Sequence, residues 1–151
     1  MYFVDRKLIY RRLRYMDRLM ETFRSQPSWE GAVDELALER ITQGYIEAML
    51  DVGNQMIDGF IMRDPGSYSD ILDILEDERV ISSEEAASLQ KVLAFRKVLV
   101  EDYLDIDHIK LHAVIQGEQQ ALKEYSSRVT EYLDRELGPV SAFLPDNEGS
   151  E

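Results

Sequence analysis

The chain contains no cysteine, so neither a disulfide framework nor a thiolate zinc site is available to it. The fold must therefore be held by a hydrophobic core and by polar contacts. With 151 residues, 44% of them apolar, the chain is long enough for one domain with a sizeable core and too short for two comfortable ones. The lack of cysteine is also compatible with a reducing cytosol.

Long hydrophobic runs are missing as well. No apolar segment approaches the roughly 20 residues of a membrane span. A charged residue already stands at position 5, so the start of the chain does not resemble a secretory signal. The sequence also lacks a phosphate-binding P-loop, a nucleophile elbow and a Rossmann fingerprint, which excludes the enzyme classes built on them. We therefore expect a cytoplasmic protein that does not contact the membrane.

Histidine is scarce, and its two copies, His108 and His112, lie one helical turn apart. In principle this spacing lets them share a zinc ion. No clear third ligand follows, and the paired Glu-x-x-His motifs of di-iron bundles are missing, with Asp105-x-x-His108 as a near match. We favour surface or capping roles for both histidines, and expect neither a metal nor a cofactor.

Basic residues are few, because 17 Lys and Arg stand against 30 Asp and Glu, which gives a net charge of -13. Such a charge argues against avid, non-specific binding of nucleic acid. Residues 1–24 are the exception, with seven basic and three acidic side chains. Arg11, Arg14 and Arg18 share one face of the predicted first helix, which either binds an RNA backbone or an acidic partner, or is simply solvated.

Apolar residues recur at helical spacing through most of the chain and predict an all-α fold. The first amphipathic helix runs from about Asp5 to just before Gln26-Pro27. A longer helix begins near Ser28, carries a wide apolar stripe that suits burial against two neighbours, and ends before the turn residues 63–66.

Three more helices are marked by their caps. Ser67-x-x-Asp70 resembles a capping box and opens a short helix, and Ser82-x-x-Glu85 is a stronger box that opens a helix running to about residue 103. A cap in Asp105-Ile106-Asp107 opens a last long helix, which Gly138-Pro139 stops. Four main helices and one short one imply an antiparallel four-helix bundle.

The domain assignment follows from these helices. We assign residues 1–137 to a single helical domain. Residues 138–151 are short, acidic and contain proline and glycine, so we expect a flexible tail there.

The stretch 95–103 places Arg96 in an apolar seam, because steps of three, four and seven residues return to nearly the same helical face. One explanation is an arginine that buries its stem and pairs its charge with Glu101, Asp102 or a carboxylate of a neighbouring helix. The other is a phosphate site, since a guanidinium presents a planar fork of donors to oxyanions.

The spacing in and upstream of this stretch carries a resemblance. It reads Phe95-Arg96-x-x-Leu99-Val100-x-x-Tyr103-x-x-Ile106-Asp107, preceded by Tyr68-Ser69-Asp70, Val80-Ile81 and Leu89. These residues resemble the signature of the HepT-like family of the HEPN superfamily, whose pattern is Phe-Arg-Asn-x-Leu-Val-His-x-Tyr followed by x-x-Ile/Val-Asp. The resemblance covers most of the chain and implies an HEPN-like bundle.

The resemblance also implies a function, that of a toxin-type, metal-independent endoribonuclease held in check by a nucleotidyltransferase antitoxin. In the family an arginine and a histidine from two protomers meet in a cleft across the dimer. Carried over to this chain, Arg96 is the phosphate ligand, and Tyr103 matches the tyrosine that the antitoxin modifies with adenosine nucleotide. The alternative for Tyr103 is a core or dimer-interface position.

Two residues depart from the family pattern: Lys97 replaces asparagine, and Glu101 replaces the catalytic histidine. We assign Lys97 and Asp102 supporting roles. Glu101 could act as a general base if it were buried, but it cannot supply a cation, and its charge opposes a phosphate. On a straight helix it also lies about 140° from Arg96, so a shared site needs a bend, a helix end or the second protomer. A simpler outcome is that Glu101 pairs with Arg96 or Lys97.

Two functions remain open. The first is a HepT-like ribonuclease, active or weakened, with Arg96 and Glu101 as its catalytic residues. The alternative is a catalytically silent helical dimer that binds RNA, nucleotide or a protein partner. In both cases we expect a homodimer, because the apolar stripes of residues 28–61 and 83–103 exceed what a five-helix domain can cover.

Overall fold

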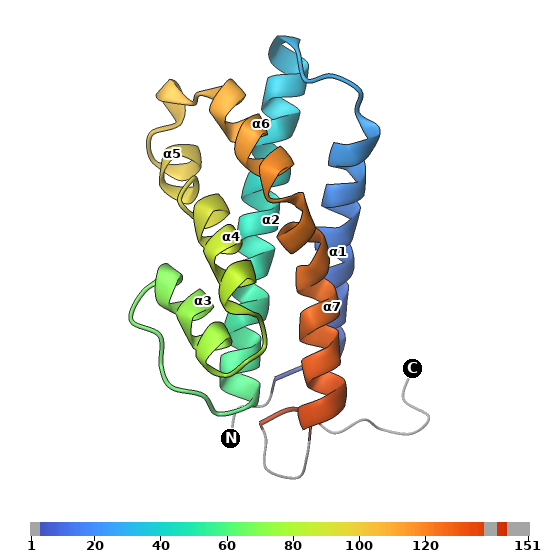
Figure 1. The fold of residues 1–151 in the computed structure, drawn as a ribbon, viewed down its shortest axis with the longest axis vertical. Helices are drawn as coiled ribbons and strands as arrows, with labels where there is room; N and C mark the ends of the chain where they lie inside the picture. The colour runs from blue at the N-terminus through green and yellow to red at the C-terminus, as the bar shows by residue number, and fades with distance from the viewer. Residues whose placement is uncertain (1–3, 138–141, 145–151) are drawn as a thin grey trace.

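The structure, a computed structural model, describes residues 4–137 and 142–144. Its helices are α1 (Arg6–Ser25), α2 (Gly31–Gly59), α3 (Tyr68–Asp77), α4 (Ser83–Leu93), α5 (Arg96–Val100), the 3₁₀ turn η1 (Tyr103–Asp105), α6 (His108–Gly117) and α7 (Gln119–Glu136). They form four antiparallel rods, α1, α2, α4 with α5, and α6 with α7, and α3 is the additional short helix (Figure 1). The expected all-α bundle is confirmed. Within the described ranges, every helix falls short of the length and apolarity that a membrane crossing requires.

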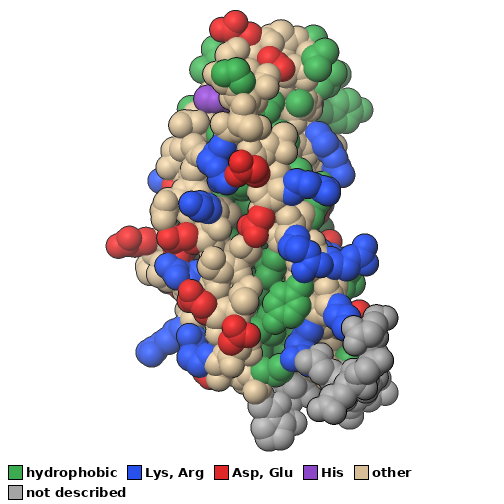
Figure 2. All heavy atoms as spheres, turned by 90° about the vertical axis from the view of Figure 1, so that its right-hand side faces the viewer, with side chains coloured by type: hydrophobic (Ala, Val, Ile, Leu, Met, Phe, Trp, Pro, Cys, Tyr) green, Lys and Arg blue, Asp and Glu red, His purple; other side chains and the backbone are tan. Residues whose placement is uncertain are grey.

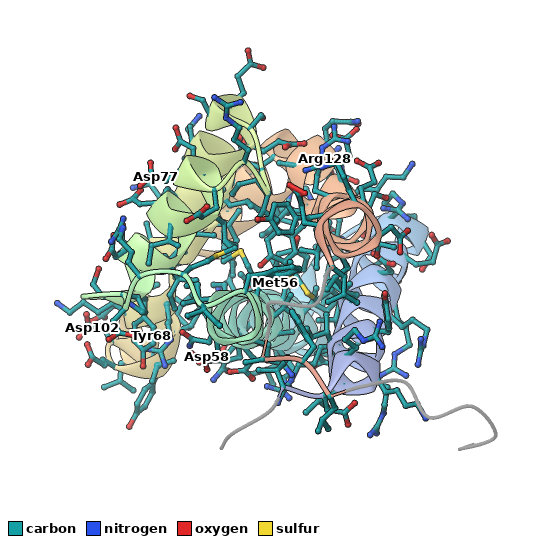
Figure 3. The ribbon with its side chains drawn as sticks, turned by 90° about the horizontal axis from the view of Figure 1, so that it is seen from below. Met56, Asp58, Tyr68, Asp77, Asp102 and Arg128 are labelled. Atoms are coloured by element: carbon teal, nitrogen blue, oxygen red, sulfur yellow. The ribbon has the colours of Figure 1, made fainter. Side chains whose placement is uncertain are left out.

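Helix α2 lies at the centre of the bundle, which explains its wide apolar stripe (Figure 3). Two buried tyrosines tie it to α7. The hydroxyl of Tyr45 donates to the carbonyl of Leu122 at 2.7 Å, and the hydroxyl of Tyr125 donates to the carbonyl of Met49 at 3.0 Å. Burial raises the pKa of both hydroxyls, so both remain neutral donors.

The predicted helix starts are mostly confirmed by capping hydrogen bonds. The carboxylate of Asp5 accepts from the amide of Lys7, and the carboxylate of Asp107 caps α6 in the same way. Ser82 forms the full capping box with its partner three residues on. The longer helix, expected to begin near Ser28, begins at Gly31 and follows an N-cap residue that makes no side-chain hydrogen bond.

Two helices that the spacing predicts to be continuous are each broken in two. The rod expected from Ser82 to residue 103 is interrupted after α4, where the amide of Phe95 donates to the carbonyl of Val92, three residues back, in a tightened turn. It ends at Glu101, short of Tyr103. The last long helix breaks at Gly117, a poor helix former, before α7 starts. Apolar spacing continues across both breaks, so periodicity alone does not reveal them.

Residues 142–144 belong to the folded unit, contrary to the expected tail. The amide of Val4 donates to the carbonyl of Ala142 at 2.7 Å, and the amide of Leu144 donates back to Val4 at 2.8 Å, as a parallel bridge. The buried ring of Phe143 fills the space above Gly59 and packs edge-on against Phe60. The rest of the expected tail, 138–141 and 145–151, lies outside the described residues.

Candidate active site around Arg96

Arg96 is the first residue of α5 and lies against the middle of α2. Its Nε and Nη2 atoms are 3.2 and 3.0 Å from Oε1 of Glu47. The side chain of Arg96 is 26% exposed and that of Glu47 is 39% exposed, so the pair lies at the surface without being fully solvated. The expectation of a pairing carboxylate on a neighbouring helix is met by Glu47, and part of the guanidinium still faces solvent.

Tyr68, at the start of α3, covers one face of the same guanidinium. The Cζ atom of Arg96 lies 4.2 Å from the centre of the Tyr68 ring, a cation–π distance. Figure 3 shows Tyr68 on the side of the molecule where α5 lies. Arg96 is thus held by an acid from α2 and a ring from α3, and this fixes its direction.

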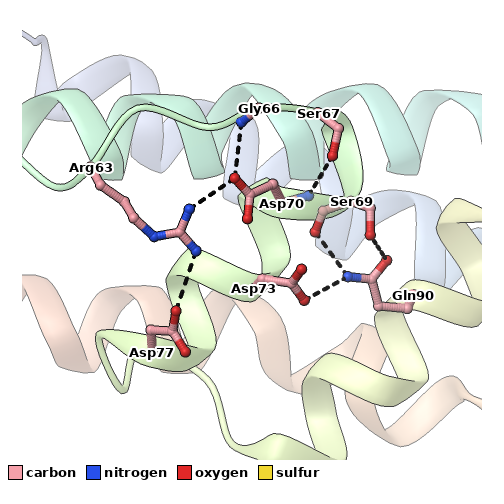
Figure 4. Close-up of polar contacts among 8 residues, drawn as sticks. All are labelled: Arg63, Gly66, Ser67, Ser69, Asp70, Asp73, Asp77 and Gln90. Atoms are coloured by element: carbon pink, nitrogen blue, oxygen red, sulfur yellow. Dashed lines mark hydrogen bonds and ion pairs between the residues drawn. The ribbon is translucent and has the colours of Figure 1, made fainter.

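A polar network holds the helix that presents Tyr68 (Figure 4). Arg63 donates to Asp70 at 2.8 Å and contacts Asp77 at 3.3 Å, and the amide of Gly66 also donates to Asp70. The hydrogen bond from Arg63 lowers the pKa of the Asp70 carboxyl. On the other side of α3, the amide of Gln90 donates to the backbone of Ser69, which joins α3 to α4. The start of α3 is therefore tied to its neighbours.

Glu101 follows the last residue of α5 and is exposed. No cation of the described residues pairs with it, so the expected pairing with Arg96 or Lys97 is not found. The Lys97 ammonium instead lies 3.8 Å from the carboxylate of Asp102, and both of these side chains are largely exposed. The burial that a base at position 101 would need is therefore absent.

Tyr103 lies in η1 and is 63% exposed, so the expected alternative of a core position is wrong for this single chain. Its neighbour Leu104 is 88% exposed. Three acidic residues lie within two positions of Tyr103 in the sequence and are exposed as well: Glu101, Asp102 and Asp105. The tyrosine hydroxyl is accessible from solvent within an acidic, partly apolar end of the molecule.

A family model described as "Ribonuclease HepT-like" matches residues 12–129, a range that contains every site element described above. The chain belongs to the HepT-like family. It is 50% identical over 143 residues to "Putative RNase YutE" of Bacillus subtilis (strain 168), a match that covers 95% of this chain and 99% of YutE. A solved structure of YutE, described as a cytosolic protein of unknown function, has a TM-score of 0.88 and is covered completely, with 95% of this chain matched.

More distant HEPN structures share the fold. A toxin–antitoxin complex with AMP-PNP contains a chain that is 15% identical, with a TM-score of 0.72, over 80% of this chain and 96% of its own length. A tri-AMPylated Shewanella oneidensis HEPN toxin in complex with its MNT antitoxin is 16% identical, with the same TM-score, over 82% and 96%. These similarities confirm the HEPN-like architecture of this HepT-like chain.

Two residues that hold Arg96 were not assigned a role from the sequence. Tyr68 lies in the upstream part of the HepT-like resemblance, but its ring contact depends on how α3 docks. Glu47 is a charged residue between Ile46 and Ala48, both buried, and this interruption of the apolar stripe is the signal that could have marked it.

The two histidines lie on α6, away from Arg96. The Nε2 atom of His108 is 2.6 Å from Oε2 of Glu39, and its Nδ1 atom is 3.6 Å from Oε2 of Glu35. The ring of His112 packs against Phe23. These contacts dock α6 on its neighbours. The described residues contain no group of three or more His, Asp or Glu side chains placed to hold a metal ion.

The basic face of α1 is on the surface, as expected. Arg11, Arg14 and Arg18 are exposed, and no carboxylate of the described residues pairs with them. They line a shallow hollow of about 590 Å³ together with Arg12 and Tyr15. Figure 2 faces the side on which α1 and α7 lie and shows several Lys and Arg side chains gathered there. This face is free to meet an anionic partner.

Proposed function

We propose that this protein is a HepT-like endoribonuclease that needs no metal, that its activity is weakened by Glu101 at the histidine position, and that a nucleotidyltransferase antitoxin controls it. The observation that carries the proposal is the placement of Arg96. Glu47 and Tyr68 fix its guanidinium at the surface, with donors left over for a phosphate.

The chemistry assigns Arg96 the role of phosphate ligand. Cleavage of RNA without a metal needs a base for the 2′-hydroxyl, a cation for the charge that develops on the phosphorane, and an acid for the leaving 5′-oxygen. A guanidinium held from two sides needs little rearrangement to stabilise that charge. YutE, which is 50% identical to this chain over 143 residues, is named as a putative RNase.

The weakening follows from local charge. Arg96 and Lys97 contribute two positive charges, whereas Glu47, Glu101 and Asp102 contribute three negative ones. A histidine at position 101 would reverse this balance when protonated and could also carry a proton to the leaving group. Glu101 does neither, because a carboxylate cannot supply a cation, and its charge opposes a phosphate.

Control by an antitoxin rests on Tyr103. HEPN toxins that share this fold are found in complexes with antitoxins, and one of those toxins is AMPylated. The exposed hydroxyl of Tyr103 is accessible to such a modifying partner. We further propose a cytoplasmic location, because YutE is described as cytosolic.

We propose a homodimer on the basis of exposed apolar side chains. Val33 and Leu36 of α2 are 80% and 63% exposed. Val100 of α5 and Leu104 of η1 are exposed as well. These large apolar residues lie on or beside elements that flank Arg96, so their burial in a dimer would bring two Arg96 sites toward one another.

We propose that the basic face of α1 binds the RNA backbone outside the site. On a chain with a net charge of -13, the exposed Arg11, Arg14 and Arg18 are the group best able to release counterions from a polyanion. The half-buried ring of Tyr15 lies 5.4 Å from the charge centre of Arg18, a cation–π distance, and so helps to hold this arginine on the same face.

One observation favours the second function, a silent dimer that binds RNA, nucleotide or protein. The charge of Arg96 is already balanced by Glu47, and no described cation accompanies Glu101. Such a site binds a phosphate weakly and lacks a proton donor for the leaving oxygen.

The deciding experiment is a cleavage assay on a mixed RNA with EDTA present. We expect slow cleavage by the wild-type protein, with 2′,3′-cyclic phosphate ends, and none by Arg96→Ala. Lys91→Ala, at an exposed position on α4 away from the site, is the matched loss of one positive charge. RNA binding without cleavage, by wild-type protein and by Glu101→His alike, would establish the silent dimer instead.

A further inference from the structure

Glu47 has one carboxylate oxygen in use and one to spare. Its Oε1 atom accepts a hydrogen bond from Nε of Arg96 and lies in ion-pair contact with Nη2, whereas its Oε2 atom takes no hydrogen bond from the described residues. The side chain is 39% exposed, so this second oxygen can meet a ligand. A carboxylate with a free oxygen therefore lies directly beside the guanidinium assigned to the phosphate.

Glu101, the carboxylate that replaces the family histidine, does not pair with Arg96. It follows the end of α5, and no described cation contacts it. Of the two carboxylates, Glu47 is the one that contacts Arg96. A general base must lie within about 2.6–3.2 Å of the proton it removes, and the 2′-hydroxyl is attached to the same nucleotide as the phosphate under attack. Proximity to the phosphate ligand thus favours Glu47.

We propose that Glu47 is the general base of the cleavage reaction, an inference that rests on the ribonuclease function proposed above. The carboxylate takes the proton of the 2′-hydroxyl, and the 2′-oxygen forms a bond to phosphorus. The bond between phosphorus and the 5′-oxygen breaks, and the leaving oxygen takes a proton from water. The products are a 2′,3′-cyclic phosphate and a 5′-hydroxyl, and Glu47 returns its proton to solvent.

The surroundings of Glu47 support this role. Arg96 lies against it from α5, and its positive charge offsets the repulsion between the carboxylate and the scissile phosphate. Tyr68 of α3 holds Arg96 from the ring side. One turn further along α2, Asp51 faces Arg12 of α1 at 3.8 Å and so is occupied elsewhere. The proposed base therefore comes from α2 and the phosphate ligand from α5, and Tyr68 of α3 holds the phosphate ligand in place.

Glu47→Gln separates the base from a purely positioning role. The amide oxygen of glutamine can still accept from Nε of Arg96, but the side chain cannot take a proton. We expect kcat to fall about 100- to 1000-fold, within the usual contribution of a general base. Affinity for an RNA that carries a 2′-deoxy sugar at the cleavage position should stay within about threefold or become tighter, since one negative charge is removed.

Asp51→Asn is the matched control, because it neutralises another carboxylate on the same stripe of α2, and it should cleave within about twofold of its parent. Both substitutions are made in the wild-type protein and in the faster Glu101→His variant, with circular dichroism to confirm folding. If Glu47→Gln cleaves within threefold of its parent, or if its affinity falls in step with its rate, the base assignment is wrong while the ribonuclease proposal stands. If neither parent cleaves RNA, the ribonuclease proposal fails and the base assignment falls with it.

Discussion

The substitution Glu101→His should convert a weak ribonuclease into a stronger one. Position 101 is exposed at the end of α5, so a histidine fits there without disturbing the core. Near neutral pH a histidine exchanges between its neutral and charged forms and can protonate the leaving 5′-oxygen. The carboxylate of Glu101, by contrast, cannot supply a cation, and its charge opposes a phosphate.

The magnitude has two parts. The site has two positive and three negative side chains in the wild type. Loss of the charge at position 101 leaves two positive and two negative side chains. At a solvated surface, the removal of one such charge is worth roughly three- to tenfold in rate. A positioned acid contributes about 100-fold or more. We therefore expect Glu101→His to cleave roughly 300- to 1000-fold faster than the wild type.

Glu101→Gln isolates the charge, because glutamine removes the negative charge but transfers no proton. The Glu101→Gln variant should therefore cleave only about three- to tenfold faster than the wild type. The three proteins are compared by initial rates on a labelled RNA in EDTA, and Arg96→Ala is added to Glu101→His, where it should abolish the gain. Equal rates for the histidine and glutamine variants would show that charge alone matters, and a wild type as fast as Glu101→His would show that Glu101 is already competent.

Three further predictions concern affinity, assembly and stability. Replacement of Arg11, Arg14 and Arg18 by glutamine should weaken RNA binding and lower the slope of log affinity against log salt by up to about three; an unchanged slope would mean that this face is merely solvated. Light scattering at micromolar concentration should give a dimer, and Leu36→Arg should shift it toward a monomer, whereas a wild-type monomer would contradict the proposed assembly. Phe143→Ala should lower the free energy of unfolding by about 3 kcal/mol, because its buried ring fills the space over α2; a chemical denaturation curve unchanged in midpoint would refute this packing.

Local chemistry in the sequence determined the helices and most of their starts. The capping box at Ser82 and the caps at Asp5 and Asp107 satisfy amides only two or three residues away. Such contacts are complete within one turn and do not depend on the rest of the chain. The apolar spacing is also a local pattern, and it was sufficient to predict an antiparallel bundle. The signature around Arg96 was sufficient to predict the family of the chain.

The helix breaks and the ordered residues 142–144 could not be predicted in this way. Apolar spacing continues across the break before Arg96, and on either side of the break α4 and α5 each pack against α2. Phe143 lies in a segment whose composition is typical of tails. Its burial depends on Gly59, more than 80 residues earlier, which leaves room for the ring.

The site shows the same division between sequence and tertiary structure. The sequence identified Arg96 as an arginine that needs a partner, but any of several carboxylates was suitable by type. Glu47 lies 49 residues away, and it meets Arg96 because α2 presents one particular face to α5. The rotation of one packed helix against another is set by the fit of the whole core, not by the residues at the contact. Tertiary structure alone therefore decided that the carboxylate beside Arg96 is Glu47 and that Glu101 faces solvent.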